Sequence, residues 1–151
     1  MNQSTHDFIN QFFNLLLGFS PTINITETQD QMFVQLELDP PHSGVLIGYQ
    51  GETLNAIQLL FSLVYQNHHQ SWKPIRLNIN DYRQKRQQSV ETLANNIAAK
   101  VVAENQSISL TNLSSYERRI IHSHLSNDPS VSTHSEGEPP HRILIVSPSS
   151  H

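Results

Sequence analysis

The sequence predicts an α+β protein of two small domains, residues 1–80 and residues 81–151 including their leading helix. Residues 1–80 switch between helical and strand-like apolar periodicity in the order helix, strand, strand, helix, helix, strand. Residues 81–151 begin with a long helical segment, continue with a capped helix and end in two strand-like runs. A chain of 151 residues that is 36% apolar has enough material for one medium core or two small ones.

The first elements are predicted to be a helix and a β-hairpin. Apolar side chains recur at helical spacing until Gly18–Pro21 ends the helix, at Phe8, Ile9, Phe12, Phe13, Leu16 and Leu17. Polar residues interrupt this stretch and no basic segment precedes it, so we expect an amphipathic helix and no membrane insertion. Residues 22–26 and 32–38 alternate between apolar and polar with a turn at Gln29-Asp30, which predicts a hairpin with one buried face.

A glycine loop then leads into the main helix of the first domain. After Pro40-Pro41 we expect a short helical turn at residues 45–47, followed by the G-x-x-G sequence Gly48-Tyr49-Gln50-Gly51. An apolar stripe predicts the next helix, with Leu54, Ile57, Leu60, Phe61 and Val64, and residues 75–79 alternate as a third strand. Glycines without Cβ atoms let a nucleic-acid backbone approach N–H groups, with bases over Val45, Ile47, Leu54 and residues 34–38. The alternative is a helix–helix turn that binds no ligand.

The second domain carries a pattern that suits phosphate. A long helix starts near Asp81, with Arg83, Lys85 and Arg86 in its first turns, where cations oppose the helix dipole and indicate either an anionic partner or plain solubility. Ser114 and Glu117 fit a capping box that starts a later helix. Arg118 and His122 then lie four residues apart on one helical face, where they suit a phosphate or form an ordinary solvated face. Arg119 and Arg142 are second-rank contacts, and Tyr116 stacks on a base or packs as a staple.

Composition and charge narrow the function classes. The chain has 13 acidic and 9 basic residues, unlike a strong duplex binder. Residues 1–80 contain six acids and two bases, whereas residues 81–151 contain seven of each, so backbone electrostatics should lie mostly in the second half. With no cysteine there is no disulfide or thiolate zinc site. The nine histidines form no metal-ligand motif, and no nucleophile elbow or P-loop occurs. We therefore expect no enzyme activity, no metal and no cofactor.

Two motifs carry a family resemblance. The segment Ser114–His122, with the later S-E-G-E-P and R-I-L-I-V, resembles the R-x-x-x-H nucleic-acid-binding domain. The element order of residues 1–80 and its G-x-x-G loop resemble a prokaryotic-type KH domain (αββααβ). A KH domain followed by this small α/β R-x-x-x-H domain is the architecture of the SpoIIIJ-associated (Jag) family of bacterial proteins, and the agreement covers residues 31–148. Two departures are the missing counterpart of a small N-terminal domain and the loop pair Tyr49-Gln50, which lacks a basic residue.

The resemblance implies a cytoplasmic bacterial regulator that binds single-stranded RNA, or single-stranded DNA, and acts post-transcriptionally, sometimes alongside a small stand-alone KH protein. KH domains clamp about four nucleotides. The expected nucleic-acid-binding residues are Ile47, Gly48, Tyr49, Gln50, Gly51, Arg83, Arg86, Arg118, Arg119, His122 and Arg142. The rival hypothesis is a protein-interaction scaffold in cell-envelope, cell-shape or division control whose nucleic-acid surfaces have weakened, and the acidic first half favours it.

Overall fold

The structure is a computed structural model that describes residues 3–70 and 72–149. The expected α+β class is confirmed, with six strands and five α-helices among the described residues. The chain divides into two compact units, Met1–Arg83 and Gln84–His151. The sequence placed the boundary after residue 80, and the two units meet within the first turn of α4 (Tyr82–Glu104).

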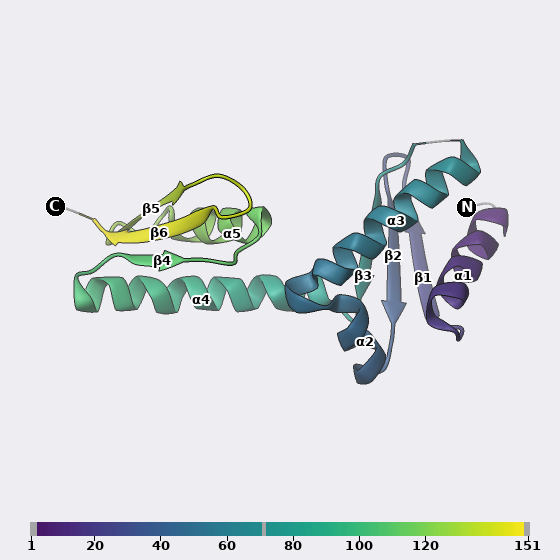
Figure 1. Ribbon diagram of the computed structural model, residues 1–151, viewed down its shortest axis with the longest axis horizontal. Coiled ribbons are helices and arrows are strands. Elements are labelled where there is room, and N and C mark those ends of the chain that lie inside the picture. Colours follow the sequence, from purple (N-terminus) through teal and green to yellow (C-terminus); the bar gives the residue numbers. More distant parts are fainter. Residues whose placement is uncertain (1–2, 71, 150–151) are drawn as a thin grey trace. The chain divides into compact units, whose positions relative to one another are not determined.

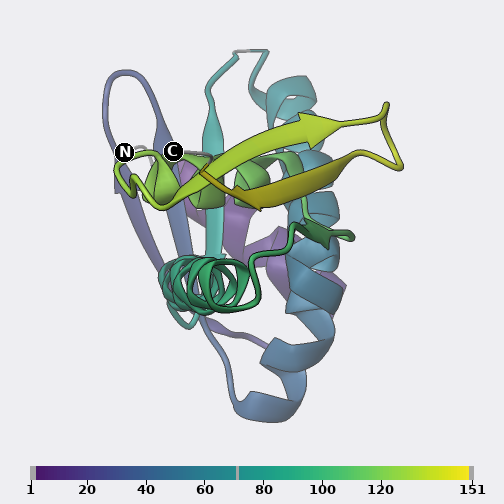
Figure 2. The same cartoon turned by 90° about the vertical axis from the view of Figure 1, so that its left-hand side faces the viewer.

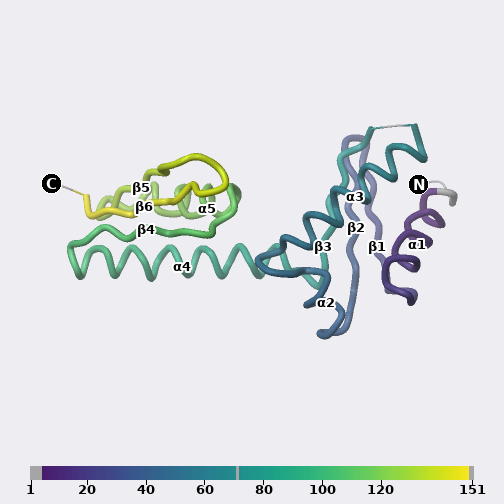
Figure 3. The backbone as a smooth tube through the Cα atoms, in the orientation of Figure 1, coloured from purple at the N-terminus to yellow at the C-terminus, as the bar shows by residue number. Residues whose placement is uncertain are grey.

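The first unit has the predicted element order (Figure 1). Its elements are α1 (Gln3–Leu17), β1 (Thr22–Glu27), β2 (Met32–Glu37), α2 (Pro40–Ile47), the 3-10 turn η1 (Tyr49–Gly51), α3 (Glu52–His69) and β3 (Ile75–Ile79). The strands form one sheet in the order β1-β2-β3, in which the predicted hairpin β1–β2 is antiparallel and β3 is parallel to β2. A parallel neighbour needs a crossover connection, which α2 and α3 supply (Figure 3).

The core of this unit lies between the sheet and the helices α1 and α3. Ile9 and Phe13 of α1, Phe61 of α3 and the inward side chains of β2 and β3 are buried together. The predicted apolar stripe of α3 is partly wrong, because Leu60 is 50% exposed and Val64 is 37% exposed. The buried positions follow a narrower arc and include Tyr65, since each residue turns the helix by about 100°.

The second unit contains most of α4, then β4 (Ile108–Leu110), α5 (Ser115–Leu125), β5 (Val131–Glu136) and β6 (Ile143–Pro148). The three strands form an antiparallel sheet in the order β4-β6-β5. The twisted β5–β6 hairpin lies beside α5 (Figure 2). Val90 and Val101 of α4 are buried with Ile121 of α5 and Leu144 of β6. Strand β4 was not predicted, because three residues are too few to show an alternating pattern. Among the described residues, no helix is long and apolar enough to cross a membrane.

Candidate nucleic-acid interface

The G-x-x-G loop is a tight turn whose two glycines have structural reasons to be there. Gly48 has φ 68° and ψ −170°, and a Cβ atom there would lie 2.0 Å from Oγ1 of Thr53. Gly51 has φ 83°, and a Cβ atom there would lie 2.8 Å from the ring of Tyr82. The fold itself therefore requires both glycines, and their presence does not by itself distinguish a ligand clamp from a helix–helix turn.

The surface of this loop is formed by its middle pair, Tyr49 and Gln50. Tyr49 is exposed, and the Gln50 side chain donates a hydrogen bond to the Tyr49 hydroxyl at 3.1 Å. The N–H groups of Gly48 and Gly51 already donate to Gly44 and Gly48 carbonyls, at 3.0 and 3.4 Å. These two amides are used within the fold, so a phosphate at this loop has to be bound by other donors.

The base groove expected beside the loop is smaller than the sequence suggested. Leu54 and Val34 belong to the buried core and present no surface to a base, which corrects that part of the expectation. Val45 is exposed and Ile47 is half-buried, because both lie at the end of α2 next to the loop. Helix α2 is also longer than the expected turn, since it begins at Pro40, where proline suits a first helical turn.

Arg83 and Arg86, the cations at the start of α4, both make contacts inside their own units. The Arg83 guanidinium donates to the Leu77 carbonyl at 3.0 Å and to the Gln58 side-chain oxygen at 2.9 Å. Arg86 forms an ion pair with Glu117, with its Nη2 at 2.6 Å and its Nε at 2.7 Å from Oε1. These contacts give both arginines a structural function, whereas nucleic-acid binding by them stays a prediction.

Helix α5 begins with the predicted capping box. The Ser114 hydroxyl accepts a hydrogen bond from the Glu117 N–H at 3.2 Å, and the Glu117 carboxylate accepts one from the Ser114 N–H at 2.8 Å. Glu117 is buried; burial raises its pKa, but the hydrogen bonds from Ser114 and Arg86 outweigh burial and lower the pKa below its ordinary value of 4.5. A buried carboxylate therefore fixes the start of α5, and the next residue, Arg118, faces outward.

The basic side chains expected in the second domain converge on one depression of about 270 Å³. It is lined by Ser115, Arg118, Arg119, His122, Ser135 and Arg142. Arg118, Arg119 and His122 come from α5, whereas Arg142 immediately precedes β6. Three guanidinium groups and an imidazole around one small hollow repel one another unless an anion neutralises them, which suits a phosphate.

Arg118 is held in place by its own helix start. Its Nη1 donates to the Leu113 carbonyl at 2.6 Å and its Nη2 donates to the Ser115 hydroxyl at 2.9 Å. A guanidinium has five N–H donors, so these two bonds orient the group and leave three donors for a ligand. Arg118 is half-buried, which further limits its rotamers.

The sequence interpretation missed three hydroxyl side chains at this site. Ser115 and Ser135 line the depression, and Nδ1 of His122 lies 2.6 Å from Oγ1 of Thr133. Thr133 and Ser135 alternate with the exposed residues of β5 and share the face of buried Val131. That strand alternation was the signal that could have placed them next to α5.

Two further sequence alternatives are affected by the structure. Tyr116 is 61% exposed, so it is not a packing staple and is available for stacking. Within residues 3–70 and 72–149, no group of three or more His, Cys, Asp or Glu side chains is placed to hold a metal ion.

The fold and these sites define a class of protein: a KH-type αββααβ domain followed by a domain with an Arg/His helix. Comparison with family models agrees. A model described as KhpA/KhpB, KH domain, matches residues 6–79, and the model of the R-x-x-x-H domain matches residues 88–148. The chain therefore belongs to the SpoIIIJ-associated (Jag) family, in which the KH domain precedes the R-x-x-x-H domain.

Several relatives carry the name RNA-binding protein KhpB. The protein from Clostridium symbiosum is 39% identical over 142 residues, which are 93% of this chain and 63% of that protein. The Lactiplantibacillus plantarum protein is 39% identical over 115 residues, 76% of this chain and 35% of its own. The protein from Bacillus subtilis is 31% identical over 126 residues, 82% of this chain and 61% of its own. The chain thus spans less than two thirds of each of these relatives.

Proposed function

We propose that this protein is a cytoplasmic regulator that binds single-stranded RNA and holds phosphates in the basic depression of α5 and at the G-x-x-G loop. The observation that carries the proposal is the convergence of Arg118, Arg119, His122 and Arg142 on one hollow. An ordinary solvated face would spread its like charges apart, because gathering them raises their repulsion. The relatives named RNA-binding protein KhpB support the choice of RNA.

A salt-dependent titration tests the depression. We expect wild-type protein to bind a short mixed-sequence RNA in fluorescence anisotropy, with affinity falling as salt rises. Arg118→Ala combined with His122→Ala should weaken binding and lower the salt slope by about 0.7 for each phosphate that is no longer neutralised. Arg76→Ala combined with His6→Ala removes the same types of side chain from exposed sites elsewhere and serves as the matched control. Equal weakening in both variants would contradict a specific site.

The loop requires a different substitution from the glycines, because Cβ atoms at Gly48 or Gly51 collide with the fold. Tyr49→Asp combined with Gln50→Asp places two negative charges on the exposed pair instead. Gln50 has φ 50°, a conformation that aspartate tolerates better than most residues. If phosphates lie at this loop, the variant binds RNA more weakly than a control with Gln11→Glu and Asn14→Asp on α1. Equal binding by both would assign the loop to a ligand-free turn.

We further propose that the two domains hold successive parts of one RNA strand. Linked sites raise overall affinity through effective concentration. A strand of about four nucleotides fills only a KH clamp, whereas a longer strand can reach both domains. The depression variant should therefore lose more affinity for a long strand than for a four-nucleotide strand. The same titrations with DNA of equal sequence determine whether the protein prefers RNA.

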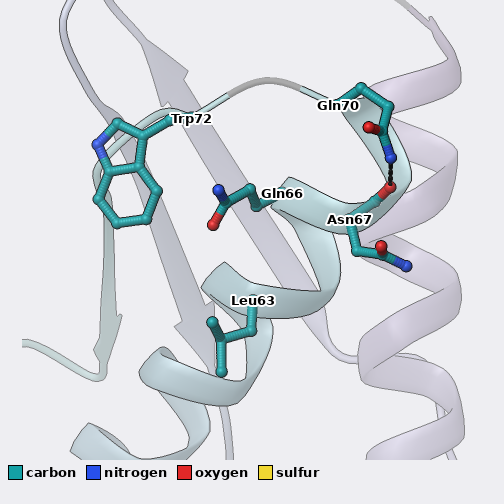
Figure 4. A pocket seen from close by; sticks show the side chains of 5 residues that line it. All are labelled: Leu63, Gln66, Asn67, Gln70 and Trp72. Atoms are coloured by element: carbon teal, nitrogen blue, oxygen red, sulfur yellow. Dashed lines mark hydrogen bonds between the residues drawn. The ribbon is translucent and has the colours of Figure 1, made fainter.

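A second candidate function, a protein-interaction scaffold, is favoured by one surface of α3. Residues 53–67 contain no charged residue, yet Leu59, Leu60 and Leu63 are exposed there. Trp72, which is 68% exposed, borders a hollow of about 310 Å³ with Leu63, Gln66, Asn67 and Gln70 (Figure 4). An uncharged apolar and amide surface lacks the cations that RNA requires and resembles the core of a protein interface.

The partner that we propose for this α3 surface is a small stand-alone KH protein, the kind of partner that the family resemblance implies. Leu59→Glu with Leu63→Glu should abolish a complex detected by size-exclusion chromatography with light scattering. RNA binding by the same variant should be unchanged. Loss of RNA binding with retention of the complex would reverse the roles of the two surfaces.

A further inference from the structure

We propose that Thr133 is a positioning residue that sets the tautomer of His122, so that a neutral imidazole donates its Nε2–H to a phosphate. This inference rests on the proposed function of the basic depression. Thr133 Oγ1 lies 2.6 Å from His122 Nδ1. The ring lines the depression, and Nε2 has no hydrogen-bond partner within the part of the chain that the structure describes.

The chemistry of imidazole decides which way this hydrogen bond must run. A neutral imidazole has one protonated and one unprotonated nitrogen, and its tautomer is fixed by the partner of either nitrogen. If the threonine hydroxyl donates to Nδ1, the ring proton lies on Nε2 and points at the ligand as a donor. In the opposite arrangement Nε2 directs a lone pair at the phosphate, which repels it. A hollow otherwise lined by guanidinium and hydroxyl donors fits the first arrangement.

The sheet holds Thr133 in the position that this function needs. Thr133 pairs with Val146 in the β5–β6 register and is half-buried, so its hydroxyl faces α5 instead of solvent. A β-branched side chain in a strand has few rotamers, which keeps Oγ1 directed at the ring.

His124, the other histidine of α5, has a different partner and serves as an internal comparison. Its Nε2 lies 2.8 Å from the amide oxygen of Asn95 on α4, away from the depression. The two histidines are two positions apart along the helix, so they point to different neighbours. Partner chemistry, rather than helix position alone, distinguishes the ligand-facing ring from the packing ring.

The test compares the full-length wild type with Thr133→Val and Thr133→Ser. Thr92→Val, at an exposed threonine of α4, is the control. Imidazole nitrogen-15 spectra at about pH 8, where histidine is ordinarily neutral, should show His122 protonated on Nε2 in the wild type and a tautomer mixture in Thr133→Val. RNA affinity at this pH should fall about three- to tenfold in Thr133→Val, as expected for a weakened hydrogen bond, and recover in Thr133→Ser. In a His122→Ala background, Thr133→Val should have no further effect.

The outcomes separate this inference from the proposed function. RNA binding that survives Thr133→Val unchanged, or a wild-type ring protonated on Nδ1, overturns the positioning role while the RNA proposal stands. If wild-type protein binds no RNA, the proposed function fails, and inorganic phosphate then replaces RNA as the probe. A phosphate-induced shift of the His122 Nε2 signal that disappears in Thr133→Val supports the positioning role, and its absence in the wild type overturns it.

Discussion

Removing Arg86 should destabilise the second unit because it leaves a buried carboxylate without its cation. The Glu117 side chain is 4% exposed, and Arg86, at 30% exposed, supplies two short hydrogen bonds to it. Arg86→Met keeps most of the aliphatic length of the side chain and removes only the charged end. The carboxylate then keeps the Ser114 N–H bond at 2.8 Å as the remaining compensation.

The size of the effect follows from these contacts. Hydrogen bonds to charged groups contribute about 1.5–3 kcal/mol, and breaking a buried ion pair costs about 3–5 kcal/mol. Because Arg86 is partly exposed and one backbone bond to Glu117 remains, we expect a loss of about 2–4 kcal/mol near neutral pH.

The pH dependence gives this loss a signature. In the wild type the lowered pKa of Glu117 provides stability that is present above pH 4.5 and is lost as pH falls below it. Without Arg86, burial dominates and raises that pKa, so the variant takes up its proton at higher pH. The difference in unfolding free energy should therefore be largest near neutral pH and should shrink as pH falls towards 4.5.

Native-state amide hydrogen exchange is the assay, because it reports each unit separately. Slow amides of Leu144 should lose protection in Arg86→Met, whereas those of Leu77 in the first unit should not. A loss below about 0.5 kcal/mol at all pH values, as for a surface ion pair, would refute the reasoning. The double variant Arg86→Met with Glu117→Leu removes both charges and should recover stability. If it binds RNA normally, Arg86 is structural; if it is stable but fails to bind, Arg86 contacts RNA.

Three further predictions concern the first unit. Burial lowers the pKa of His69, so this unit should lose stability as pH falls below 6.5, and His69→Phe should remove that dependence in urea unfolding; a pH-independent wild type would contradict it. Gly51→Ala should cost about 1–3 kcal/mol, because φ is 83° and a Cβ atom meets the Tyr82 ring; an unchanged urea midpoint would exclude this strain. Lys73→Ala should cost at most about 1 kcal/mol, because its pair with Glu27 is near the surface, and a larger loss on thermal unfolding would indicate a tighter pair.

Element types were predictable from the sequence where periodicity was long and caps were explicit. The helix around Phe13, the hairpin, the third strand and the capping box at Ser114 appear as expected. Strand β4 was hidden by its length, and the outer positions of α3 were assigned to the stripe because apolar residues there continue beyond the buried arc. Sequence shows which residues are apolar, but only packing shows which of them are covered.

The site was predictable in its charged residues and not in its neutral ones. Four basic side chains expected from the R-x-x-x-H pattern and the segment after the Gly137 loop line one hollow. Thr133, Ser115 and Ser135 were missed because hydroxyl residues are common and a sequence does not reveal which strand faces which helix. Arg83 and Arg86 illustrate the converse, since a cation in the sequence carries no sign of the carboxylate or carbonyl that will bind it.

The start of α5 joins stability and binding in neighbouring residues. Glu117 turns inward, pairs with Arg86 and caps the helix, while Arg118 turns outward and is held by Leu113 and Ser115. Any change that releases Glu117 also frees the turn from which Arg118 extends. Loss of RNA binding in a variant of the inward residues is therefore expected even if they never touch RNA, and only variants that restore stability distinguish contact from support.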